Sequence, residues 1–213
     1  MAVINKGILG GIAGKVGNVV GGNWKGIDYL RSMPASVANP KTLKQQTQRA
    51  KFTAALNFLK PLTSLLPIGF KNYANGMTAF NVAMSYNVKN AITGVYPAFA
   101  LNYPVAQISR GNLTGASGAA VTSTVAANVV FNWANNAGTG NALATDTAIL
   151  VTFFPTLGEA VYKVTTIARS AATATLTCPA KYSTRQAHGW LIFQTADGKT
   201  QANSAYIGTV TAV

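Results

Sequence analysis

Hydrophobic positions follow three different patterns along the chain. Residues 1–38 intersperse glycines with valines and aromatics, whereas residues 39–95 repeat apolar positions every three to four residues. Residues 96–213 alternate apolar and polar positions between turn signals. The three-to-four repeat is typical of a helix with one buried face, and alternation is typical of a half-buried strand. We therefore expect an α+β protein that consists of a glycine-rich β-ribbon arm, a helical hairpin and a C-terminal β-sandwich.

The ribbon is predicted from the stretch GGIAGKVGNVVGGNWKGIDYLRSMP, residues 10–34. Its valines and aromatics favour strands. Residues 21–23 (Gly-Gly-Asn) and 25–26 (Lys-Gly) suit turns or bulges, because Gly and Asn tolerate positive φ. We expect this arm, residues 1–38, to extend toward a neighbouring molecule. Its cations would then be exposed for contact: Lys15, Lys25 and Arg31.

Two other interpretations of this stretch were weighed against the ribbon. A phosphate-binding Walker loop around Gly14-Lys15 needs glycine where Leu9 stands and a hydroxyl where Val16 stands. The dinucleotide fingerprint G-x-G-x-x-G fails at Ile12. The G-x-x-x-G spacings would suit a cationic membrane-active helix, but each glycine costs a helix about 1 kcal/mol. The ribbon is therefore the favoured interpretation.

The second stretch, residues 39–95, carries signals for two helices. Asn39 can cap a helix and Pro40 suits the first helical position, while Pro61 ends or kinks this helix. A second helix is predicted over residues 76–92.

Basic and amide side chains occupy the polar faces of the first predicted helix. Gln45 and Arg49 are four residues apart and share one face. Such groups can contact phosphate or the backbone of another subunit. The candidate contact residues in this stretch are Lys41, Lys44, Gln45, Arg49 and Lys51.

Seven short strands are expected in the C-terminal part. They are predicted at residues 119–125, 128–133, 147–154, 159–166, 173–178, 188–195 and 203–210. Seven strands in about a hundred residues indicate a sandwich of immunoglobulin or fibronectin type over residues 119–213. Trp133 and Trp190 fall on its second and sixth strands, where core aromatics are expected. Residues 96–118 are then a linker with short strands.

Charge is scarce and unevenly distributed. Charged residues make up 10% of the chain and hydrophobic residues 49%, while the net charge is +13. Residues 1–110 hold 12 basic residues and one acid, Asp28. Few charges indicate surface that is buried against other chains. The basic half is compatible with a polyanion partner.

Candidate catalytic groups are sparse. His188 with Asp146 or Asp197 could belong to a nucleophilic triad, but GASGA at residues 115–119 misses the nucleophile motif. A glycosidase pair would have to come from the four acids of the chain: Asp28, Asp146, Glu159 and Asp197. One histidine and one cysteine cannot build a usual zinc site. Cys178 is expected to be a small buried hydrophobe. We predict no enzyme activity, no cofactor and no metal.

Targeting signals are equally sparse. The apolar run at the N-terminus is short and broken by glycines, unlike a secretory signal, and no stretch of about 18 apolar residues exists. Membrane association is not expected.

Two sequence motifs carry a resemblance. GKVGNVVGGNWKGIDYLRSMP is followed by a helix motif formed by Asn39, Pro40, Thr42, Gln45, Arg49 and Phe52. Together with WANNAGTGNALATDTAILVTF and SAYIG further on, they resemble a poorly characterised bacterial family of unknown function. The two N-terminal motifs are also similar to those of phage virion components. The resemblance implies no catalytic residues.

We therefore expect a structural self-assembling protein, namely a phage capsid, tail or decoration subunit or a similar bacterial assembly subunit. Its partners would be copies of itself and other virion proteins, and its location the virion if it is phage-encoded, otherwise the cytoplasm. Two alternatives stay open. One is a nucleic-acid-binding or packaging protein that uses the basic half, and the other is a surface adhesin-like binding module.

Overall fold

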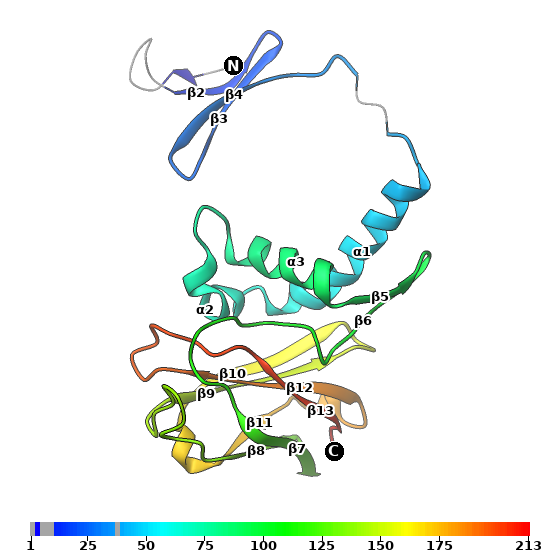
Figure 1. Ribbon diagram of the computed structural model, residues 1–213. Coiled ribbons are helices and arrows are strands. Elements are labelled where there is room, and N and C mark those ends of the chain that lie inside the picture. Colours follow the sequence, from blue (N-terminus) through cyan, green and yellow to red (C-terminus); the bar gives the residue numbers. More distant parts are fainter. Residues whose placement is uncertain (1–2, 5–10, 37–38) are drawn as a thin grey trace. The chain divides into compact units, whose positions relative to one another are not determined.

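The computed structural model describes residues 3–4, 11–36 and 39–213 (Figure 1). The chain divides into two compact units, residues 1–45 and residues 46–213. Strands dominate and every sheet is antiparallel, with few helices, so the expected mixture of α and β structure is confirmed at this level.

The first unit contains a four-stranded antiparallel sheet, here called the N-terminal sheet. Its strands follow chain order: β1 (Val3–Ile4), β2 (Ile12–Val16), β3 (Val19–Trp24) and β4 (Ile27–Ser32). Lys25 and Gly26 form the β3–β4 turn with φ of 49° and 85°, as predicted. The predicted turn at residues 21–23 is wrong, because these residues lie inside β3. Gly21 is needed there for close approach, since a Cβ would collide with the backbone oxygen of Ile12.

The helices differ from the prediction in where they begin and how they connect. They are α1 (Leu43–Leu59), η1 (Lys60–Leu62), α2 (Leu66–Gly69), η2 (Lys71–Tyr73) and α3 (Ala79–Asn90). The predicted start at Asn39-Pro40 is wrong. Instead, the amide N–H of Gln45 donates to Thr42 Oγ1 at 3.4 Å, the geometry of a Thr-x-x-Gln cap. Pro61 follows the end of α1 as predicted, but α2 and two short 3-10 turns, rather than a tight turn, separate the two long helices.

Two sheets form the C-terminal part, and each of the seven predicted strands overlaps an observed one. The central sheet has the order β10 (Glu159–Ala168), β9 (Thr147–Phe154), β12 (Gln186–Gln194), β13 (Ala205–Thr211). The outer sheet has the order β11 (Thr173–Thr177), β8 (Asn128–Ala134), β7 (Ser117–Val125). A separate hairpin pairs β5 (Ile92–Val95) with β6 (Ala98–Leu101).

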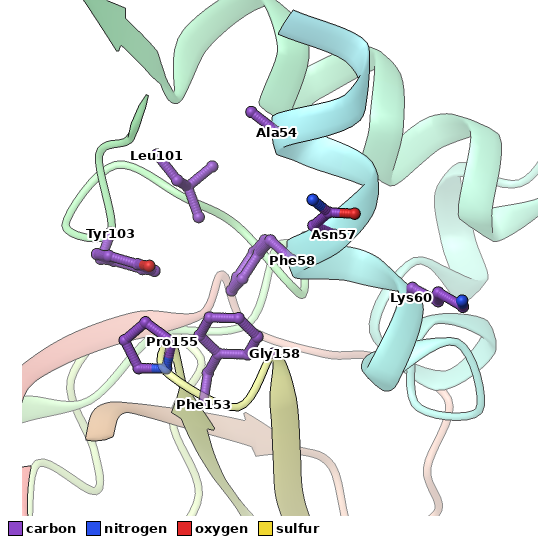
Figure 2. Close-up of a pocket in the computed structure, with 9 residues that line it drawn as sticks. All are labelled: Ala54, Asn57, Phe58, Lys60, Leu101, Tyr103, Phe153, Pro155 and Gly158. Carbon is purple, nitrogen blue, oxygen red and sulfur yellow. The ribbon is translucent and has the colours of Figure 1, made fainter. Parts of the chain in front are cut away.

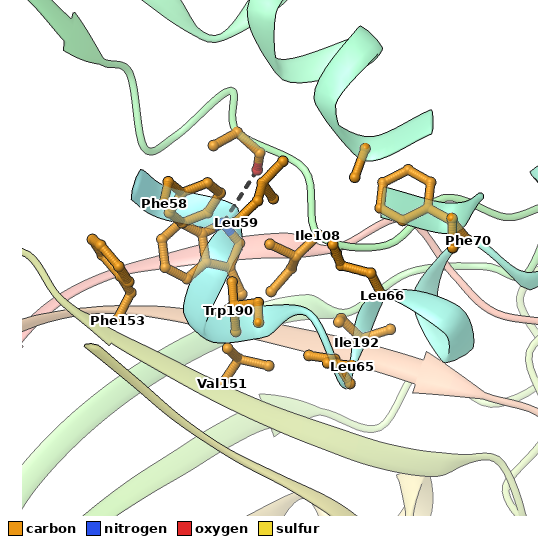
Figure 3. Close-up of a cluster of buried hydrophobic side chains, with 14 of the residues drawn as sticks. Phe58, Leu59, Leu65, Leu66, Phe70, Ile108, Val151, Phe153, Trp190 and Ile192 are labelled. Carbon is orange, nitrogen blue, oxygen red and sulfur yellow. Dashed lines mark hydrogen bonds between the residues drawn. The ribbon is translucent and has the colours of Figure 1, made fainter. Parts of the chain in front are cut away.

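The central sheet is buried on both faces. One face packs against the outer sheet through a cluster that includes Phe131, Trp133 and Leu191. The other face packs against the helices through a cluster that includes Phe58 and Trp190, whose indole Nε1–H donates to the Ala106 carbonyl at 3.3 Å (Figure 3). The two tryptophans therefore belong to two different cores. A helical layer covers a face that a free sandwich would leave in solvent.

Candidate interaction surfaces

The strand register sorts the N-terminal sheet into two faces. Lys15 pairs with Val20, and Val20 pairs with Arg31, so these side chains lie on one face. We call this face the aromatic face; between residues 15 and 31 its side chains are Lys15, Val20, Trp24, Ile27, Tyr29 and Arg31. The opposite, aliphatic face carries Val16, Val19, Asn23, Asp28, Leu30 and Ser32.

Large apolar side chains on both faces of this sheet are exposed. Ile27 is 69% exposed, Leu30 61% and Trp24 51%. Among the described residues, neither hydrophobic core includes a residue of this sheet. All six residues of the edge strand β4 are exposed. A small sheet needs a covered apolar face to be stable, and contiguous exposed apolar surface marks an interaction site.

The predicted contact residues lie on several different elements. Lys15 and Arg31 lie together on the aromatic face, and Lys25 lies at the β3–β4 turn. Lys41, Lys44 and Gln45 are exposed in the same unit, before and at the start of α1, and Arg49 is exposed further along that helix. Lys51 is half-buried, with Nζ 5.3 Å from the centre of the Phe99 ring.

The helical layer has a cationic and aromatic hollow that the sequence did not indicate. The Arg110 guanidinium carbon lies 4.9 Å from the ring centre of Tyr73 and 5.0 Å from that of Tyr86. Lys89 lines the same hollow, which measures about 270 Å³. We call it the Arg110 hollow. The signal that could have found it is the complete absence of acids between residues 46 and 118.

An aromatic pocket lies where the end of α1 meets the central sheet. It measures about 390 Å³ and is lined by Phe58, Tyr103, Phe153 and Lys60 among others (Figure 2). Beside it, His188 stacks on Tyr103 with ring centres 3.6 Å apart. His188 Nδ1 is hydrogen bonded to the Tyr206 hydroxyl at 2.9 Å.

Burial sets the titration of these rings. It lowers the pKa of His188, and it raises the pKa of Tyr103 together with the nearby Tyr206. Burial thus favours the neutral form of His188, whose ring lies among those of Tyr103, Trp190 and Tyr206. These contacts make the imidazole part of the aromatic packing beside the pocket.

Asp146 belongs to a buried ion pair. Its Oδ2 accepts from Arg169 Nε at 3.2 Å and from the Leu143 amide at 2.9 Å, so it also fixes a turn. Arg169 also donates to the carbonyls of Thr114 and Gly115 and lies on the Phe193 ring. Burial lowers the pKa of Arg169, and Asp146 partly restores it. The pair ties the linker to the sheets.

One family model matches nearly the whole chain. The model of a family described only as a family of unknown function, DUF6266, matches residues 11–208. The chain belongs to the DUF6266 family. No curated protein matches the chain. The family description names neither an activity nor a virion role, so the phage-like motifs of this DUF6266 protein stay a prediction.

None of the helices in the described residues is long and apolar enough to cross a membrane. Within the same residues, no group of three or more His, Cys, Asp or Glu side chains is placed to hold a metal ion.

Proposed function

We propose that this DUF6266 protein is a structural, self-assembling protein whose N-terminal sheet docks onto a second copy of the chain. The observation that carries the proposal is the exposure of Val16, Val19 and Leu30 on one face of a sheet whose described residues belong to neither hydrophobic core. Burying apolar surface contributes roughly 25 cal/mol per Å², and this face gains that energy only from another surface.

Charge favours a second copy on the aliphatic face in particular. The whole chain is strongly positive, so two copies repel unless their cations stay apart. Lys15 and Arg31 lie on the aromatic face. Among the described residues, the aliphatic face carries one charge, Asp28, which accepts a hydrogen bond from Asn23 at 2.7 Å. Pairing through the aliphatic face buries aliphatic side chains while the cations point away. The exposed edge of β4 offers backbone groups to the same partner.

We also propose that the seven strands β7 to β13 are a β-sandwich of immunoglobulin or fibronectin type. The first, second and fifth strands share one sheet, and the third, fourth, sixth and seventh share the other. This order differs from the constant-type immunoglobulin sandwich in its fourth strand alone, because β10 pairs with β9 and not with β11. Such a sandwich would be the body of a virion subunit or a similar bacterial assembly subunit.

Replacing apolar residues of the aliphatic face tests the docking. We expect light scattering coupled to gel filtration to give an oligomer for the natural chain at tens of micromolar and a monomer for Val19→Lys/Leu30→Lys. The control Val125→Lys/Leu143→Lys adds the same charge at side chains that are each 60% exposed on the other unit, and it should still assemble. A natural chain that is monomeric at high concentration, or a control that dissociates equally, contradicts the proposal.

A further inference from the structure

We propose that the helical layer of residues 46–118 binds single-stranded nucleic acid across two neighbouring hollows that meet at Lys89. The phosphate groups would lie on Lys89 and Arg110, and the bases would stack on Phe52 and Tyr73. None of the cations named earlier in the contact prediction forms this site. The inference does not depend on the docking of the N-terminal sheet.

The Arg110 hollow is built to hold a phosphate at the edge of a guanidinium. Tyr73 and Tyr86 both contact the Arg110 group, at 4.9 and 5.0 Å from their ring centres. Rings that hold the cation leave it less free to move, while its N–H groups lie in the guanidinium plane, where a phosphate accepts two of them. Lys89 lines the same hollow and adds a second positive charge.

A second hollow lies on the other side of Lys89 and supplies an aromatic surface. It measures about 350 Å³, is lined by Phe52, Met84 and Val88, and shares Ser85 and Lys89 with the Arg110 hollow. The Phe52 side chain is 48% exposed, although α1 buries other apolar residues on its far side. We call this second hollow the Phe52 hollow. One continuous surface thus offers Phe52, then Lys89, then Arg110 and Tyr73.

The electrostatic balance of this layer favours an anion. Residues 46–118 contain six cations and no acid, namely Arg49, Lys51, Lys60, Lys71, Lys89 and Arg110. The three acids of residues 119–213 each pair with a cation of the sheet region: Asp146 with Arg169, Glu159 with Lys181, and Asp197 with Lys199. All three acidic side chains of this unit therefore already have a cation partner outside the helical layer.

The pattern selects single-stranded nucleic acid over an acidic protein or a duplex. Exposed aromatic rings on either side of two cations match unstacked bases that are joined by phosphates. An acidic peptide would use the cations and leave Phe52 and Tyr73 unexplained. A duplex hides the faces of its bases and could not stack on either ring.

Fluorescence anisotropy with a labelled 20-nucleotide oligothymidylate tests the site on the full chain. At 50 mM salt, Lys89→Gln/Arg110→Gln should weaken binding at least tenfold. In a plot of log affinity against log salt concentration, the slope of this variant should be shallower by about 1.4, because two phosphate contacts are lost and each contributes about 0.7. The control Lys163→Gln/Arg185→Gln removes two exposed cations of the sheet region and should change affinity less than threefold. Equal losses in the two variants would overturn the proposal.

A second pair of measurements separates stacking from charge. Phe52→Leu keeps an apolar side chain but loses the ring, so it should weaken oligothymidylate binding about fivefold. Phe52→Leu should not change the concentrations at which unlabelled polyphosphate and polyglutamate displace the labelled oligonucleotide. If those polyanions compete as well as the oligonucleotide, or if Phe52→Leu has no effect, the layer is a general anion surface and the proposal fails. Lys89→Gln alone, at an exposed position, keeps the test valid if the Arg110 variant unfolds.

Discussion

Strands β4 and β9 show how differently one chain uses its apolar residues. All six residues of β4 are exposed, whereas every residue of β9 except Thr147 is buried. β9 lies between two paired strands and has a covering layer on each face. β4 is an edge strand, and its neighbour β3 contributes Gly21 and Gly22, which bring no side chain. Apolar content makes a core only where another element of the same chain covers it.

Truncating one aromatic residue in each region should give the largest difference in the free energy of unfolding between the two regions. Phe131→Ala opens a cavity between the central and outer sheets and should lower the free energy of unfolding by about 3–5 kcal/mol. Trp24→Ala removes an aromatic residue that is half exposed. It should change the free energy of unfolding of residues 46–213 by less than about 0.5 kcal/mol. Urea titration monitored by circular dichroism measures both. Similar losses in the two variants would show that the N-terminal sheet is part of the same cooperative structure.

Removing one member of the buried ion pair should have the next largest effect. Asp146→Ala leaves the fully buried Arg169 without its carboxylate and should cost about 3 kcal/mol or more. The exposed pair Lys181–Glu159 is the matched case, and Glu159→Ala should cost much less, because water already solvates both partners. Thermal unfolding of the two variants gives the comparison. If Asp146→Ala were as stable as Glu159→Ala, the result would contradict the role of Arg169 in anchoring the linker.

Protonation of His188 should give the smallest effect. Because burial lowers its pKa in the folded state, the unfolded chain binds this proton more readily. Stability is then full above the unfolded pKa of about 6.5 and falls as the pH drops below it toward the folded pKa. The urea concentration at the unfolding midpoint of the natural chain should decrease as the pH is lowered from about 7.5 to about 5.5. In His188→Gln, the midpoint should depend less on pH. An unchanged slope in His188→Gln would mean that another group titrates.

The strands were predictable because their signals are local. Alternation and turn residues gave all seven strands of the C-terminal part, and Asp197-Gly198 marks a turn whose carboxylate accepts from the Lys199 amide at 3.0 Å. The hydrogen bond from the Thr195 hydroxyl, together with that from the Lys199 amide, lowers the pKa of Asp197 to about 2. The start of α1 was misjudged because Asn39-Pro40 and Thr42 are competing cap signals, and only the geometry shows that Thr42 accepts the bond.

What joins distant segments could not be predicted in the same way. Nothing local in the sequence brings Arg110 between Tyr73 and Tyr86, or Arg169 against residues 114–115. These contacts depend on tertiary packing across gaps of 24 to 55 positions. The burial of the central sheet on its second face was missed for the same reason. The nearly unbroken apolar run TAILVTFF was its one visible sign, since a strand covered on both faces has no polar alternation.

The position of β9 has a consequence for the folding of residues 46–213. Ile149, Val151 and Phe153 point into the core shared with the helices, while Ala148, Leu150 and Phe154 point into the core shared with the outer sheet. Neither core can lose its partner layer without exposing one side of this strand to water. The helices and the seven strands should therefore melt in one transition, and a fragment cut at residue 119 would be a poor folding unit although the sequence predicts that the sandwich begins there.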